Sequence, residues 1–160
     1  MPDNGSGPEP SRRTTLPDLL RAQAARRPDD TAVVYGEGRL TYRELVRESG
    51  RLAGCLYGLG VRADDRVGLF VEPSPELMTG AWGILFAGGA YLPLSPEYPE
   101  ERLRYMIEDS ATRVILTQAD LVDRLSALAP KGTAIVTLED AEGFGPAPTR
   151  PAAENLAYVI

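Results

Sequence analysis

Residues 85–110, LFAGGAYLPLSPEYPEERLRYMIEDS, contain in one run the parts of an α/β layer. An apolar helix end meets the glycine pair Gly88-Gly89, and a short extended run follows at residues 90–94. Prolines close that run, and an amphipathic helix opens at Glu100. The order of helix, sharp turn, buried strand, loop and helix predicts an α/β fold, in which helices flank a mostly parallel sheet.

The rest of the chain repeats this alternation of helical and β-rich patterns. Two capping signatures, Thr15 with Asp18 and Thr41 with Glu44, open helices. The turn Gly36-Glu37-Gly38 predicts a small hairpin near the start. Expected helices cover residues 16–27, 42–59, 76–86, 100–109 and 119–128, and expected strands cover 32–35, 39–41, 66–71, 90–94, 113–117 and 134–138.

Three segments lie outside this alternation. Residues 1–13 are rich in Pro, Gly and Ser, which predicts a disordered leader. Residues 139–153 have the Pro, Gly and acidic composition of a linker. Residues 156–160 then read as the start of a further strand. With nothing beside it, such a strand would leave backbone donors and acceptors unpaired, so we expect an incomplete domain over residues 14–160.

Composition narrows the classes of function. The chain has 160 residues and a net charge of −6, with no basic block, so neither nucleic acid nor a membrane is an expected partner. It contains no histidine, which excludes a Ser-His-Asp triad and histidine metal sites. Its single cysteine, Cys55, lies on the apolar side of an expected helix. We interpret it as a packed core thiol in a cytoplasmic protein.

No residue can be assigned a catalytic, cofactor-binding or metal-binding role from these patterns. The glycines near residue 88 precede their strand and lack the spacing of a dinucleotide fingerprint, and no P-loop is present. Adjacent carboxylates do not share a helix face, which favours solvated or capping roles over acid–base chemistry. The residues considered on these grounds are Asp64, Asp65, Glu100, Glu101, Glu108, Asp109, Lys131 and the tyrosines Tyr91, Tyr98 and Tyr105, the last three expected to pack locally.

Two segments resemble the opening motifs of amino-acid adenylation domains of nonribosomal peptide synthetases, in the acyl-adenylate-forming (AMP-binding) superfamily. Residues 40–45, LTYREL, match the first motif, L-T/S-Y-x-E-L. Residues 85–94, LFAGGAYLPL, are similar to the second, with Phe86 in place of lysine, and Ser95 follows in place of aspartate. These two departures are expected to alter only surface and turn details. The opening helix and strand are also similar, so the resemblance covers the chain from about Thr15.

The resemblance implies a fold, an activity and partners. The fold would be the N-terminal subdomain of the acyl-adenylate-forming fold, and residues 155–160 would be the strand that leads into the phosphate loop T-S-G-S/T-T-G-x-P-K-G. The full-length parent would use ATP and magnesium to convert an amino or related carboxylic acid into an acyl-adenylate. It would then load the acyl group onto a carrier-protein phosphopantetheine thiol, and an accessory protein is a further candidate partner.

The chain itself, on this interpretation, is a scaffold that binds neither cofactor and is inactive alone. The parent would be a stand-alone enzyme, an initiating module or an interrupted adenylation domain, and Met1 ahead of the leader suggests that no condensation domain precedes it. An alternative is a non-catalytic α/β interaction module that complements a separately encoded remainder. A flavodoxin-like domain ranks lower, because no phosphate-binding loop follows the first strand.

Overall fold

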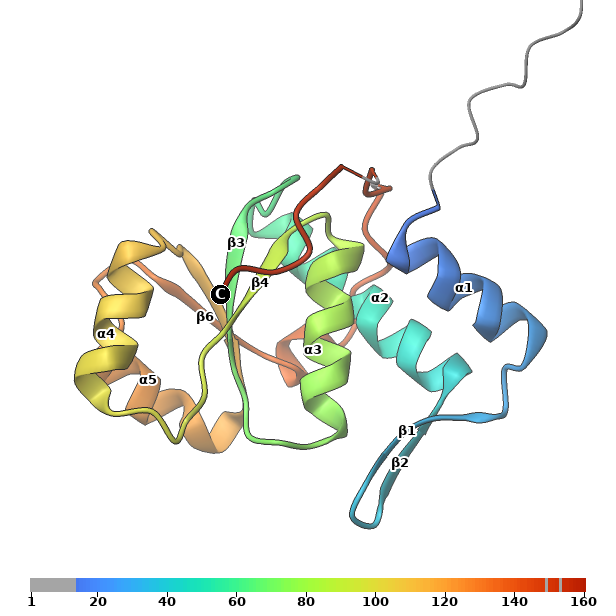
Figure 1. Ribbon diagram of the computed structural model, residues 1–160, viewed down its shortest axis with the longest axis horizontal. Helices are drawn as coiled ribbons and strands as arrows, with labels where there is room; N and C mark the ends of the chain where they lie inside the picture. Colours follow the sequence, from blue (N-terminus) through green and yellow to red (C-terminus); the bar gives the residue numbers. More distant parts are fainter. Residues whose placement is uncertain (1–13, 149, 153) are drawn as a thin grey trace, which may run out of the picture.

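The computed structural model describes residues 14–160 except 149 and 153, and the expected leader 1–13 lies outside these residues (Figure 1). The helices of this part are α1 (Leu16–Arg26), α2 (Tyr42–Gly58), α3 (Pro75–Phe86), α4 (Glu100–Asp109) and α5 (Val122–Leu128), with 3-10 helices η1 (Ala119–Leu121) and η2 (Glu139–Ala141). The strands are β1 (Thr31–Tyr35), β2 (Gly38–Thr41), β3 (Arg66–Phe70), β4 (Ala90–Pro93), β5 (Val114–Thr117) and β6 (Ala134–Thr137). None of the helices just named is long and apolar enough to cross a bilayer.

The strands form a small hairpin and one parallel sheet, which confirms the predicted fold class. β1 and β2 pair antiparallel through the turn at Gly36 and Glu37. The sheet has the order β4-β3-β5-β6, with every neighbouring pair parallel. The chain therefore starts the sheet at β3, moves outward to β4, and returns to the other side of β3 for β5 and β6.

Each face of the sheet supports its own hydrophobic core, because side chains alternate along a strand. On β3, Val67 and Leu69 face a core shared with α1, α2 and α3, whereas Phe70 faces the core shared with α4 and α5. On β5, Leu116 and Ile115 divide in the same way. In Figure 1 α2 and α3 accordingly lie on one side of the sheet, with α4 and α5 on the other.

Both predicted capping boxes are present and fix where the first two long helices begin. The hydroxyl of Thr15 accepts from the Asp18 amide at 3.2 Å, and the Asp18 carboxylate accepts from the Thr15 amide. The Glu44 carboxylate accepts from the Thr41 amide at 2.8 Å in the same arrangement. These bonds satisfy amides that the first helical turn leaves without partners.

Glycines let α3 approach its neighbours closely. A Cβ on Gly83 would lie 2.8 Å from Cγ of the fully buried Leu52 on α2, and one on Gly80 would lie 2.7 Å from Leu69 of the sheet. Beyond α3, Gly88 has φ +88°, a conformation that side chains rarely adopt. The sharp turn predicted between the helix end and the strand therefore depends on Gly88.

The segment that the sequence indicates as a linker, 139–153, packs against α2 over its first part. η2 buries Ala141, and residues 143–147 then cross the glycines Gly50 and Gly54 of α2. A Cβ at Gly54 would overlap the carbonyl oxygen of Gly145. We call residues 143–147 the strap, because this stretch carries the chain from β6 across α2.

Candidate functional site at the open edge of the sheet

The C-terminal segment, residues 155–160, lies beside β4 at the edge of the sheet (Figure 1). The Tyr91 amide donates to the Ala157 carbonyl and the Val159 amide donates to the Tyr91 carbonyl, both at 3.0 Å. The Tyr91 and Tyr158 rings stack with centroids 6.0 Å apart. The strand expected at residues 156–160 is thus present only as a single parallel bridge between Tyr158 and Tyr91. Its side toward β4 is paired, whereas the sequence predicted a strand with nothing beside it.

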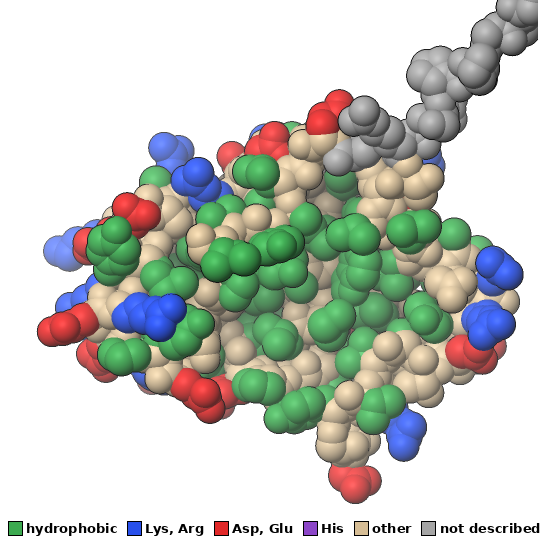
Figure 2. Space-filling model, viewed as in Figure 1, with side chains coloured by type: hydrophobic (Ala, Val, Ile, Leu, Met, Phe, Trp, Pro, Cys, Tyr) green, Lys and Arg blue, Asp and Glu red, His purple; other side chains and the backbone are tan. Residues whose placement is uncertain are grey.

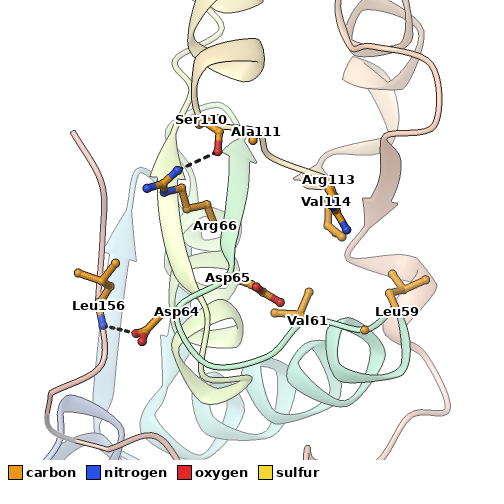
Figure 3. Close-up of a pocket in the computed structure, with 11 residues that line it drawn as sticks. Leu59, Val61, Asp64, Asp65, Arg66, Ser110, Ala111, Arg113, Val114 and Leu156 are labelled. Carbon is orange, nitrogen blue, oxygen red and sulfur yellow. Dashed lines mark hydrogen bonds between the residues drawn. The ribbon is translucent and has the colours of Figure 1, made fainter.

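Asp64 joins this segment to the loop that enters β3. Its carboxylate accepts a hydrogen bond from the Leu156 amide at 2.7 Å, and its own amide donates to the Gly88 carbonyl. Figure 3 shows Asp64 directed at Leu156, while Arg66 is directed at the Ser110 carbonyl, which it reaches at 3.1 Å. The edge is therefore built from three distant parts of the chain.

A cavity of about 780 Å³ lies beside this joint, at the amino ends of β3 and β5 (Figure 3). Its charged lining includes Asp65 and Arg66, but both bind backbone groups: the Asp65 carboxylate accepts from the Arg62 amide at 2.8 Å, and Arg66 holds Ser110. Asp65 and Arg66 thus serve as structural ties to neighbouring backbone segments.

The crevice where doubly wound sheets bind ligands is at the opposite ends of the strands, between β3 and β5. Here Gln118 spans it: its side chain accepts from the Glu72 amide at 2.9 Å and donates to the Glu76 carboxylate at 2.5 Å. The buried hydroxyl of Thr117 donates to the Phe70 carbonyl. The polar groups of this crevice thus satisfy one another.

Apolar side chains are exposed around the open edge. Figure 2 shows hydrophobic side chains gathered across the face that contains α3 and the C-terminal segment. Leu16 and Leu19 of α1 are each more than half exposed, and with Leu156 they border a hollow of about 190 Å³. Tyr158 is 53% exposed and Ile160 fully so. An apolar surface of this kind, next to a segment that pairs on one side only among the described residues, is typical of a face that another segment or protein covers.

The titratable groups with shifted pKa values all have structural causes. Hydrogen bonds from Thr15 lower the pKa of Asp18, and hydrogen bonds from the amide and hydroxyl of Thr41 lower that of Glu44. Burial, with a smaller contribution from Asp140, raises the pKa of the Cys55 thiol, which is free and buried as predicted. Among residues 14–160, with 149 and 153 set aside, no three His, Cys, Asp or Glu side chains are grouped as metal ligands.

The tyrosines and the motif departures differ in part from expectation. Tyr98 lies under the Arg102 guanidinium at 4.0 Å, so it packs locally, but Tyr105 is 67% exposed. Phe86 is only 2% exposed and packs between Trp82 and Arg21, so the expectation of a surface detail is wrong for it. Phe86 follows about one turn of buried, apolar positions in α3, and this apolar run was the sequence signal that could have predicted its burial. Ser95 does sit in a turn, where its hydroxyl accepts from the Glu97 amide.

A family model described as "AMP-binding enzyme" matches residues 20–160, and the chain belongs to this family. Indigoidine synthase of Streptomyces lavendulae is 57% identical in an alignment of 154 positions that covers 92% of this chain and 12% of that protein. Indigoidine synthase of Dickeya dadantii is 50% identical, over 92% of this chain and 10% of that protein. The chain thus spans about a tenth of the length of these curated relatives.

Solved structures agree with the family. The nonribosomal peptide synthetase FmoA3 is 39% identical, with a TM-score of 0.85 over 95% of this chain and 16% of that one. The N-terminal subdomain of Klebsiella oxytoca NpsA has a TM-score of 0.78 at 19% identity, over 93% of this chain and 38% of that one, which shows the fold alone. The predicted resemblance to adenylation domains and the predicted subdomain fold are both confirmed.

Proposed function

We propose that this chain is the scaffold portion of an adenylation domain, whose whole protein activates an amino or related carboxylic acid with ATP. The product would be an acyl-adenylate, which then acylates a carrier-protein phosphopantetheine thiol. The observation that carries the proposal is the open edge: in a family member of this fold, the C-terminal segment pairs with β4 on one side, and exposed apolar side chains lie beside it.

The scaffold role follows from what the side chains already do. In the crevice, Gln118 bonds to the Glu72 amide and the Glu76 carboxylate, and at the joint Asp64 and Arg66 bond to backbone groups. Among the described residues, no three His, Cys, Asp or Glu side chains are grouped as metal ligands. Our proposal assigns the binding of ATP and Mg²⁺ to other parts of the whole protein. This chain holds the sheet edge in place and excludes water from beneath it.

Partners and location follow from the same proposal. The remainder of the adenylation domain would cover the open edge, and a carrier protein would receive the acyl group; an accessory protein is a further proposed partner. The free, buried Cys55 fits the reducing cytoplasm, which we propose as the location.

A chimera tests this function. Residues 14–160 replace the matching segment of the adenylation domain of S. lavendulae indigoidine synthase, and ATP–pyrophosphate exchange is measured with each of the twenty common amino acids. We expect the chimera to exchange with the same acid as the unmodified synthase. A chimera that folds with the circular dichroism and unfolding midpoint of the unmodified synthase, yet exchanges with no acid, would refute the proposal.

The same assay separates the alternative of a self-standing module. The chain and the remainder of the synthase domain are purified as two polypeptides and then mixed. Exchange that appears on mixing supports a module that complements a separate chain, whereas exchange only in the covalent chimera supports a scaffold that is part of one continuous domain.

A further inference from the structure

Asp64 combines an unusual backbone conformation with a long-range hydrogen bond. Its φ is 65°, in the left-handed region that residues other than glycine rarely adopt. Aspartate tolerates this region when its short polar side chain makes a local hydrogen bond. Here the carboxylate bonds instead to the Leu156 amide, 92 residues away and at 2.7 Å. The conformation of Asp64 thus directs a charged acceptor at the C-terminal segment.

The loop around Asp64 is held against the start of β4. The Asp64 amide donates to the Gly88 carbonyl at 3.0 Å, and the Ala90 amide donates to the Asp65 carbonyl at 2.8 Å. Figure 3 shows the Asp64 side chain of this loop directed at Leu156. Because two backbone hydrogen bonds fix this loop to β4, the Asp64 carboxylate has a fixed position relative to the strand that the C-terminal segment must pair with.

The register of that pairing rests on few contacts: the single bridge between Tyr91 and Tyr158, the stacking of their rings and the packing of Val159. A slip by one residue would turn every side chain of the segment to the opposite face. Val159, which packs against the core shared with α4 and α5, would then change places with an exposed neighbour. The Leu156 amide precedes the bridge by two residues, so anchoring it selects one register.

We propose that Asp64 is a positioning residue that sets the register of the C-terminal strand against β4. By fixing Leu156, it determines which way the segment faces at Val159 and where the strand delivers the chain at Ile160. The consequence for catalysis rests on the proposed function, in which the remainder of the domain supplies nucleotide binding.

Amide hydrogen exchange on the purified 160-residue chain tests the structural part. Asp64→Gly keeps a residue suited to positive φ but removes the acceptor. We expect the Leu156 amide to exchange about tenfold faster in this variant, because it loses a hydrogen bond to a charged group. Asp64→Asn retains both an acceptor oxygen and tolerance of positive φ, so it should restore protection.

The matched control is Asp65→Asn, which removes the same charge one residue along the chain. Asp65 binds the Arg62 amide and not the C-terminal segment, so this variant should leave Leu156 exchange unchanged. Unchanged protection of Leu156 in Asp64→Gly, or equal acceleration in Asp65→Asn, would overturn the inference. Unfolding midpoints of all variants show whether a change in exchange is local or global.

The catalytic consequence is tested in the chimera described above. We expect Asp64→Gly to raise the KM for ATP in pyrophosphate exchange about tenfold, because a displaced C-terminal strand would misplace the nucleotide-binding part of the domain that it positions. Asp64→Asn should return the KM to the chimera's own value. An unchanged KM in Asp64→Gly would contradict a positioning role. Failure of the unsubstituted chimera to exchange would instead refute the proposed function, and the hydrogen-exchange result would stand independently.

Discussion

Alanine substitutions in the glycines of α2 test whether the strap is part of the folded unit. At Gly54 the strap lies directly against the helix: a Cβ there would overlap the Gly145 carbonyl oxygen and lie 3.0 Å from its carbon. At Gly50, one turn earlier, a Cβ would meet only Pro146, at 3.8 Å, which is ordinary contact. The two positions share a helix and differ in how closely the strap approaches them.

The expected magnitudes have opposite signs. Alanine is more favourable than glycine inside a helix by about 1 kcal/mol, so Gly50→Ala should raise the free energy of unfolding by up to that amount. Gly54→Ala gains the same term but forces the strap away from α2, and overpacking of this kind costs about 1–3 kcal/mol. Displacement also disturbs the packing of Ala147 and the Phe144–Ala141 hydrogen bond. We therefore expect the two variants to differ by about 2 kcal/mol, with Gly54→Ala the less stable.

Equilibrium unfolding in urea measures this difference. Trp82 is the chain's single tryptophan and packs against the core shared by α1, α2 and α3, so its fluorescence reports the relevant packing. Equal denaturant slopes would show that the variants unfold from comparably compact states. If Gly54→Ala proved as stable as Gly50→Ala, the strap would not be packed on α2, and residues 139–153 would be the linker that their composition indicates.

Three further substitutions or treatments have defined outcomes. Thr41→Ala should lower the free energy of unfolding by about 1 kcal/mol at neutral pH, through loss of the N-cap. The pKa of Glu44 is lower in the folded chain than its ordinary value of 4.5, so the ionised carboxylate stabilises the fold fully above that value. This stabilisation is lost as the pH falls through the lower folded pKa. The difference in unfolding free energy between wild type and Thr41→Ala, measured in urea, should therefore shrink in acid. The Cys55 thiol should resist alkylation at pH 8 until the chain unfolds, because burial limits access to it and raises its pKa. Mass spectrometry follows the labelling, and rapid labelling of the native chain would contradict the burial of Cys55. Phe86→Lys should lower the free energy of unfolding in urea by more than about 3 kcal/mol, because it places a charge in a buried site. The Arg21 guanidinium, 4.4 Å from the Phe86 ring centre, adds a like charge beside it. Wild-type stability of this variant would refute the prediction.

Local patterns sufficed for most of the fold. Capping boxes at Thr15 and Thr41 identify helix starts because the bonds involved join residues three apart, and each can be read from the chain directly. The β-rich runs at β3 and β5 are buried on both faces, so they appear as nearly continuous apolar sequence. The turn at Gly88 is likewise a property of one residue and its neighbours.

Features that depend on distant contacts were beyond such patterns. The strap has the composition of a linker, and its packing depends on glycines some 90 residues earlier in α2. Their spacing of four along one helix was the only local signal. Phe86 occupies a motif position that usually carries lysine, and its ring contacts Arg21 on another helix.

The candidate site shows the same division. Catalytic and phosphate-binding motifs have fixed spacings, so a sequence can be searched for them without knowledge of the fold. The pairing of the C-terminal segment with β4 could not be recognised in this way, since it depends on one bridge at Tyr91 and one side chain, Asp64, in an exposed loop. Nothing in the local sequence of Asp64 distinguishes it from Asp65, which makes a short-range bond instead.

The scaffold role is tested by ATP–pyrophosphate exchange with the purified 160-residue chain, supplied with ATP, Mg²⁺, labelled pyrophosphate and a mixture of the common amino acids. We expect exchange no faster than in a blank without protein, because the proposed function assigns the nucleotide chemistry to the rest of the domain. Exchange above the blank that co-purifies with the chain and disappears when it is unfolded would contradict the scaffold role.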